Sequence, residues 1–283
     1  MDRRFGAVAL TALLFLTGCS FLGAVPGGPG TGTPAQTATA TATPSPSPTA
    51  TATPTDSPTA RPEPLPAGYS PTGVDNLSVA LERHRTALVD TGSFTISYQA
   101  TLLTDRGRSA ISSVRSTNVT QALGYEATNI TNGATRERFL TDGTAYVRTN
   151  PAGGDVYYNQ TSNAEYDPAR YTAVGLVRPA LENVTYKNAE RIERGNRTFF
   201  RFRASDVRDL ESLLGAGVSP TNVTSFDAAI VVAADGSVQR VGYQATVERG
   251  DEEFAVQVRI DVIQQGDVVL GEPVWLDEAK QST

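Results

Sequence analysis

The stretch Phe254-Ala255-Val256-Gln257-Val258-Arg259-Ile260-Asp261-Val262 decides the fold. Apolar side chains occupy every second position, and mostly polar ones lie between them. Such alternation is typical of a β-strand with one buried and one solvent-facing side. The segments 226–232 and 241–247 alternate in the same way, with an Asp235-Gly236 turn between them. Three such strands in succession predict an antiparallel meander with one apolar face.

The alternation continues upstream in shorter segments. Further strands are predicted at 94–102, 109–120, 123–130, 135–141, 144–149, 157–158, 184–191 and 197–204, and a last edge strand at 268–275. Helices are predicted at 74–90 behind a Thr72–Asp75 capping box, after Asp167-Pro168 with a kink or end at Pro179, and behind Ser205. This mixture predicts an α+β fold, in which a large antiparallel sheet curves into a half-barrel with helices packed on its concave face.

The N-terminus carries an export signal. Arg3-Arg4 precedes a short apolar run at 6–16, which leads into Leu16-Thr17-Gly18-Cys19. A run of this length is typical of a signal peptide and too short for a membrane-spanning helix. We expect cleavage before Cys19 and lipidation of its thiol, by two chains if anchoring is to be firm. The alternative is a chance cysteine in an ordinary signal peptide, and both twin-arginine and general secretory export remain open.

Residues 20–70 are almost entirely Thr, Pro, Ala, Ser and Gly. Such a segment cannot bury enough apolar surface to fold, so it is predicted to be a disordered stalk, either O-glycosylated or unmodified. The chain is thus divided into a signal peptide at 1–18, a lipid-anchored stalk at 19–70 and one folded domain at 71–283. This order predicts a monomeric protein on the extracellular face of the cytoplasmic membrane.

Composition excludes several functions. The net charge of −6 and a pI near 5.0 argue against nucleic acid as a partner. Cys19 is the only cysteine, which excludes disulfides and thiolate zinc sites. His84, the only histidine, lies on the apolar stripe of the first helix, where packing is the expected role and a ligand or base the alternative. No catalytic, phosphate-binding or metal-binding motif occurs, so we expect no enzyme activity, cofactor or metal.

The lipidation motif, the Thr/Pro-rich segment, the stretch 81–88 and the strand after it resemble haloarchaeal surface lipoproteins. Only Lys187 and Lys280 are lysines among 24 basic residues, which suits a salt-adapted source. The order of elements is also similar to the LolA/LppX/LprG lipoprotein fold. That resemblance implies an apolar cavity between sheet and helices that holds a lipid or another hydrophobic ligand. The alternative is a structural or interaction protein of the cell envelope with a filled core.

Two groups of site residues follow from the predicted strands. Aromatic side chains at the strand positions predicted to face inward would either line such a cavity or simply form the core. They are Phe94, Tyr98, Tyr125, Phe139, Tyr146, Phe200, Phe202, Tyr243 and Phe254. Six Asn-x-Ser/Thr sequons are candidates for N-glycosylation: Asn118, Asn129, Asn159, Asn183, Asn196 and Asn222. Asn196 and Asn222 are expected to be the most accessible. A seventh sequon, at Asn76, lies in a predicted helix turn and is less convincing.

Overall fold

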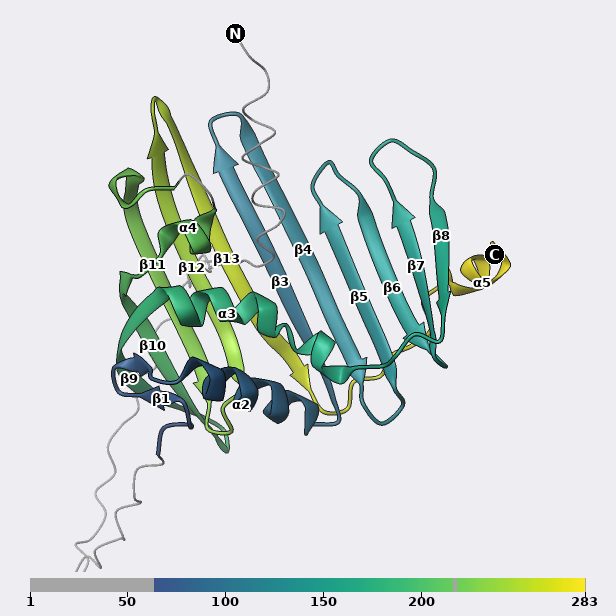
Figure 1. The fold of residues 1–283 in the computed structure, drawn as a ribbon, viewed down its shortest axis with the longest axis horizontal. Helices are drawn as coiled ribbons and strands as arrows, with labels where there is room; N and C mark the ends of the chain where they lie inside the picture. The colour runs from purple at the N-terminus through teal and green to yellow at the C-terminus, as the bar shows by residue number, and fades with distance from the viewer. Residues whose placement is uncertain (1–63, 216–217, 283) are drawn as a thin grey trace, which may run out of the picture. The chain divides into compact units, whose positions relative to one another are not determined.

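The computed structural model describes residues 64–215 and 218–282 (Figure 1). The predicted signal peptide, Cys19 and nearly all of the predicted stalk lie outside these residues. The described chain forms a curved, unclosed antiparallel sheet of 11 strands, in the order β8-β7-β6-β5-β4-β3-β13-β12-β11-β10-β9. The helices between residues 77 and 214 pack on one face of it, which we call the inner face; the other is the outer face. The predicted α+β half-barrel is confirmed. No helix in the described residues is long and apolar enough to cross a membrane.

The elements have the following bounds. The strands of the large sheet are β3 (Ser93–Thr104), β4 (Gly107–Asn118), β5 (Leu123–Ile130), β6 (Thr135–Thr141), β7 (Thr144–Asn150), β8 (Tyr157–Ser162), β9 (Val184–Arg194), β10 (Arg197–Val207), β11 (Val223–Ala233), β12 (Val238–Arg249) and β13 (Glu252–Gln265). The helices are α2 (Leu77–Val89), α3 (Val174–Asn183), α4 (Leu210–Leu214) and α5 (Leu276–Gln281), with 3-10 turns η1 (Pro168–Thr172) and η2 (Pro220–Asn222). A small ladder pairs β1 (Tyr69–Ser70) with β2 (Gly73–Val74).

The predicted meander lies in the interior of the sheet, between β3 and β10. β11, β12 and β13 are hydrogen-bonded neighbours, as their alternation indicates. β13 then pairs with β3, which lies about 160 residues earlier, with Val258 opposite Ala100 and Ile260 opposite Tyr98. This single pairing joins two runs of consecutive hairpins, β3–β8 and β9–β13.

The inner face of β9–β13 and β3 carries the main core. α2 buries Leu81, His84 and Leu88, and α3 and α4 add further buried residues on the same face. Tyr69 stacks on Phe202 with ring centroids 5.6 Å apart. Among the described residues, this part of the face is filled by closely packed apolar side chains.

The outer face of β5–β8 carries a second, smaller core. Phe139 is buried there together with Trp275, Leu276 and Ala279 from α5 and the residue before it. The chain reaches this face by an extended segment, 266–275, that crosses the ends of β3 and β4 (Figure 1). The strand predicted at 268–275 is therefore wrong. Val268 bonds to the side chains of Ser93 and Asn118, at 3.0 and 3.3 Å, rather than to a strand backbone.

Helix starts differ from the prediction because other side chains cap them. Asn76, rather than Thr72, caps α2, with its side-chain oxygen accepting from the amide of Val79 at 3.1 Å. Asp209, rather than Ser205, caps α4, because β10 continues to Val207.

The helix predicted after Asp167 is two elements. Ala173 has a left-handed φ of 56°, which ends η1 and starts α3. Pro179 lies inside α3 and does not end it.

Candidate functional site

Strand register places opposite charges side by side on the inner face of β4–β6. Glu126 lies directly across from Arg115 on one side and from Arg138 on the other. Cross-strand neighbours on one face lie within side-chain reach of each other. The three residues therefore form a continuous charged row.

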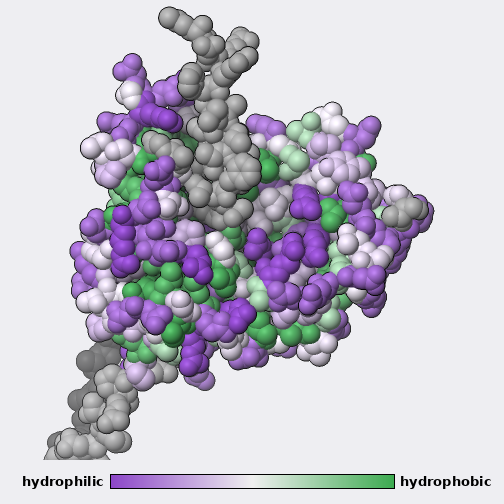
Figure 2. Space-filling model, in the orientation of Figure 1, coloured by the Kyte–Doolittle hydropathy of each residue, from purple (hydrophilic) through white to green (hydrophobic). Residues whose placement is uncertain are grey.

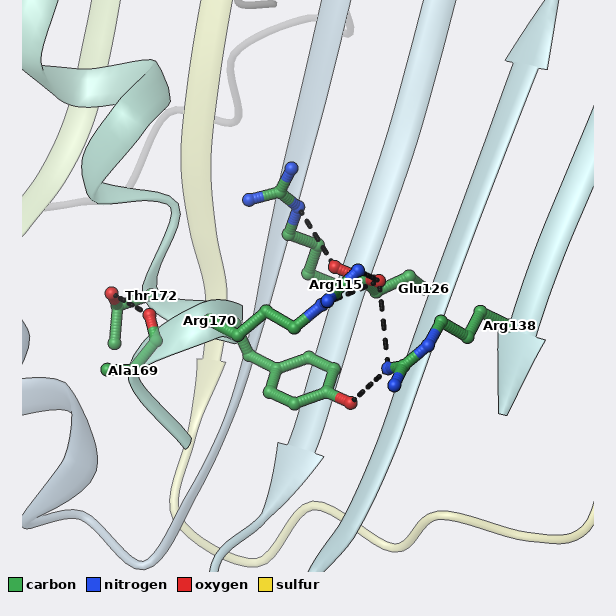
Figure 3. Close-up of polar contacts among 7 residues, drawn as sticks. Arg115, Glu126, Arg138, Ala169, Arg170 and Thr172 are labelled. Atoms are coloured by element: carbon green, nitrogen blue, oxygen red, sulfur yellow. Dashed lines mark hydrogen bonds and ion pairs between the residues drawn. The ribbon is translucent and has the colours of Figure 1, made fainter. Parts of the chain in front are cut away.

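η1 adds a third arginine above this row. Arg170 donates from Nε and Nη2 to Oε2 of Glu126, at 3.2 and 3.1 Å (Figure 3). The hydroxyl of the buried Tyr171 accepts from Nη1 of Arg138 at 3.1 Å. Gly124 makes this approach possible, because a Cβ there would lie 1.9 Å from the Tyr171 hydroxyl. We call Arg115, Glu126, Arg138 and Arg170 the arginine cluster.

Arg115 is the least satisfied member of the arginine cluster. Its Nε lies 3.8 Å from Oε1 of Glu126, too far for a hydrogen bond. Figure 3 shows the end of its guanidinium turned away from Glu126. Among the described residues, Arg115 has no hydrogen-bond partner, although only 26% of its side chain is exposed. Burial lowers its pKa, with the nearby charge of Glu126 opposing the shift.

The arginine cluster carries excess positive charge in an acidic protein. Three arginines surround one carboxylate, and Arg136, exposed on β6, lies on the same face. The other acidic group near Arg170 is Asp167, whose side chain caps η1. Figure 2 shows hydrophilic residues gathered on this side of the face. Chemically, the arrangement can bind an anion by charge-assisted, forked hydrogen bonds.

Apolar side chains on the same face are only partly covered. Toward the β3–β4 hairpin, Leu102 and Ile111 are half-buried, and so are Phe254 on β13 and Phe226 on β11. Further along these strands the same phase is fully buried, for example at Tyr98 and Ile260. We call these four half-buried residues the apolar margin. It continues the main core toward solvent.

Nearly the whole sequence matches one known protein family. A family of unknown function, DUF7537, matches residues 4–279. The chain belongs to this family. No curated protein matches the sequence.

Two solved structures show a weak similarity to this DUF7537 chain. One is a DUF1329 family protein from Desulfovibrio piger, with 10% identity, a TM-score of 0.24, and coverage of 69% of this chain and 95% of its own. The other is described as an outer membrane lipoprotein-sorting protein domain from Vibrio parahaemolyticus, with 9% identity, a TM-score of 0.16, and coverage of 70% and 96%. At such low TM-scores these likenesses carry no argument about ligand or activity.

The nine aromatic residues predicted from this DUF7537 sequence do not meet in one place. The main core or its edge contains Phe94, Tyr98, Phe200, Phe202, Tyr243 and Phe254. Tyr125, Phe139 and Tyr146 instead lie on the outer face, around α5. These residues lie in strands, as predicted, but the sequence does not show that this half of the sheet buries its aromatic side chains on the opposite face.

The six candidate asparagines differ in their exposure to solvent. Asn129, Asn159 and Asn196 are exposed, whereas Asn118, Asn183 and Asn222 are half-buried. Two of the half-buried amides already donate hydrogen bonds: Asn118 to Val268 at 3.3 Å, and Asn222 to Glu248 at 2.9 Å. Asn222 is thus less accessible than predicted, while Asn196 lies at the exposed β9–β10 turn.

His84 is fully buried, and within residues 64–215 and 218–282 it belongs to no group of side chains that could hold a metal ion. Its Nε2 lies 2.9 Å from the Thr172 carbonyl, and the Val238 amide donates to its Nδ1 at 3.0 Å. Because a carbonyl only accepts and an amide only donates, both bonds require the neutral ring with its proton on Nε2. This placement fits the packing role rather than that of a ligand.

Sequence reasoning missed the arginine cluster. The alternating positions of Arg115, Glu126 and Arg138 are visible in the predicted strands, yet their pairing depends on register across two hairpins. Arg170 is separated from Glu126 by 44 residues, and no local signal connects the two.

Proposed function

We propose that this protein is a non-catalytic lipoprotein of the cell surface, anchored through Cys19 and spaced from the membrane by the stalk. Its domain binds a lipid or another apolar ligand on the inner face of the sheet. The predicted signal peptide and the lipidation motif read from the sequence support the anchoring. The exposed sequons Asn129, Asn159 and Asn196 are its glycosylation sites in a host that modifies such sequons.

The observation that carries the binding proposal is the apolar margin. Leu102, Ile111, Phe226 and Phe254 face the same side as the main core but are left half-exposed by the described helices. Apolar surface that stays partly open beside a polar region is typical of a site for an amphiphilic partner. The ligand would lie here, and not beneath α2 and α3, where apolar side chains already fill the space.

Native mass spectrometry of the full chain, purified in a mild detergent, tests this proposal. We expect an adduct of lipid mass that is lost on denaturation. Ile111→Asp introduces a charge into the apolar margin and should abolish the adduct. Ser112→Asp is the matched control, because Ser112 is its exposed neighbour on the outer face and should leave binding unchanged. Equal adducts in both variants, or none in the native protein, would contradict the proposal.

The second candidate is a structural or interaction protein of the envelope. The filled core beneath α2 and α3 favours it, since a packed interior leaves no room for a ligand there. A clean mass without adduct in repeated preparations would support this role.

Anchoring is tested separately, through Cys19→Ser in the full chain. Removing the thiol removes the attachment point of the lipid, so the protein should move from the membrane fraction to the medium or the soluble fraction. Unchanged membrane association of the Cys19→Ser protein would contradict anchoring through this residue.

A further inference from the structure

One guanidinium of the arginine cluster makes no hydrogen bond within the described protein. Arg170 makes two hydrogen bonds to Glu126, and Arg138 makes one to Tyr171. Arg115, by contrast, donates no hydrogen bond to any described residue and approaches Glu126 only to 3.8 Å. None of the Arg115 nitrogens is among the fully buried polar atoms that lack a partner, so these donors reach solvent and are open to an anion.

Local charge makes the anion the favoured occupant. Glu126 offers a single negative charge to Arg115, Arg138 and Arg170, and all three contact it within 4.0 Å. The pKa of Arg170 is raised mainly by its hydrogen bond to Glu126, so that arginine is already satisfied. The N–H donors that remain available to a ligand are therefore mainly those of Arg115, whose terminal nitrogens point away from the carboxylate (Figure 3).

The position of the arginine cluster relative to the apolar margin suggests the shape of the ligand. Arg115 and Ile111 lie on the inner face of β4, four residues apart. A strand rises roughly 3.3 Å per residue, so the two side chains are separated by about 13 Å along the strand. Ile111 lies across from Ala100, beside Leu102 of the margin. A ligand bound to both would need an anionic end and an apolar end.

We propose that Arg115, with Arg138 beside it, binds the phosphate group of an anionic amphiphile whose apolar part covers Ile111 and Leu102. This inference rests on the proposed function and names the ligand class for the same face. Arginine suits the role because its planar fork donates two parallel hydrogen bonds to phosphate oxygens. Glu126 limits the affinity by competing for the same guanidinium groups.

Three probes distinguish the sources of the phosphate in a calorimetric titration of the full chain in nonionic detergent. They are short-chain phosphatidic acid, the matching neutral diacylglycerol and inorganic phosphate. We expect phosphatidic acid to bind at least about tenfold more tightly than either of the others, since only it supplies both ends. Inorganic phosphate binding as tightly as phosphatidic acid would overturn the amphiphile and identify a free-anion site.

Variants then assign the binding to the arginine cluster. Arg115→Gln should weaken phosphatidic acid binding by about tenfold or more, because it removes charge-assisted hydrogen bonds. Arg108→Gln is the matched control: it removes the same charge from an exposed position on the outer face of β4 and should leave the affinity unchanged. Equal affinities for the native, Arg115→Gln and Arg108→Gln proteins would overturn the inference.

Glu126→Gln gives a test of opposite sign, which keeps the inference falsifiable if Arg115→Gln does not fold. Loss of the competing carboxylate should strengthen phosphatidic acid binding several-fold in a protein whose circular dichroism is native. A weaker affinity in that folded variant would overturn the inference. If diacylglycerol binds as tightly as phosphatidic acid and no arginine variant changes the affinity, the inference fails while the proposed function stands. If no amphiphile binds, both fail.

Discussion

His84 shows how one side chain couples the fold to pH. Burial lowers its pKa to about 4 from an ordinary value of 6.5, despite opposing effects of the Thr172 carbonyl and Asp235. The unfolded chain therefore binds a proton at a pH where the folded one does not. Stability from this residue is complete above about pH 6.5 and is lost as the pH falls toward 4.

The expected loss is about 3 kcal/mol of unfolding free energy between pH 6.5 and pH 4. Denaturant unfolding at several pH values measures it. His84→Gln should be less stable at neutral pH, because it breaks the paired bonds to Thr172 and Val238. Its stability should nevertheless change far less across the same pH range. An identical pH profile in the two proteins would show that His84 is not the titrating group.

Gly124 is a second residue on which local geometry depends. The side chain of Tyr171 rests against it, and a Cβ would lie 1.9 Å from the tyrosine hydroxyl. We expect Gly124→Ala to lower the unfolding free energy by about 1–3 kcal/mol, the usual cost of overpacking a well-packed site.

Gly175→Ala is the control for Gly124→Ala. Apart from its chain neighbours and the backbone of its own helix, no atom lies within 4 Å of a Cβ built on Gly175, and alanine is favoured in a helix. Thermal unfolding should show an unchanged or slightly raised midpoint for Gly175→Ala and a lowered one for Gly124→Ala. Equal midpoints would show that Tyr171 moves aside without cost.

At the scale of elements, α5 and the strands beneath it form a unit of their own. Trp275 stacks on Tyr158 with centroids 6.4 Å apart, and Tyr158 donates to Glu278 of α5. The buried part of this unit consists of only four residues, far fewer than the main core contains. A small core of this kind opens at lower cost than a large one.

Trp275 is the only tryptophan in the chain, so its fluorescence reports on this unit alone. We expect its emission to shift to longer wavelength at lower denaturant concentration than the loss of β-sheet circular dichroism. Ala279→Asp places a charge in the buried contact and should produce the shift without denaturant, leaving the sheet signal intact. Coincident transitions in the native protein would show instead that both cores unfold together.

At the scale of the whole molecule, β13 joins the two runs of hairpins. It pairs with β12 on one side and β3 on the other, and it supplies Val256, Val258 and Ile260 to the main core. Without it, β3 and β12 would both present unpaired edges, which promote aggregation.

A chain ending at Arg249 should therefore fail to fold and should aggregate. A chain ending at Trp275 loses only α5 and should keep the circular dichroism of the sheet. Size-exclusion chromatography and circular dichroism of the two truncations make the comparison. A soluble, monomeric and folded chain ending at Arg249 would contradict the role given to β13.

The sequence by itself determined the meander, the other strands of the large sheet except the wrongly predicted one at 268–275, and the apolar side of the strands around the meander. These follow from side chains that alternate along one strand, a local property that needs no knowledge of partners. It also indicated a signal peptide and a lipidation motif, both of which lie outside the described residues. Caps were less predictable, since Thr72, Asn76, Ser205 and Asp209 are all chemically able to cap a helix.

Only the tertiary structure decided which face each half of the sheet buries and which charges meet. Phe139 follows the same alternation as Phe94, yet it packs outward because α5 arrives on that side. Arg115, Glu126 and Arg138 become neighbours through register, and Arg170 joins them through the position of η1. Contacts between distant segments depend on how whole elements pack, and that information is not contained in any local pattern of residues.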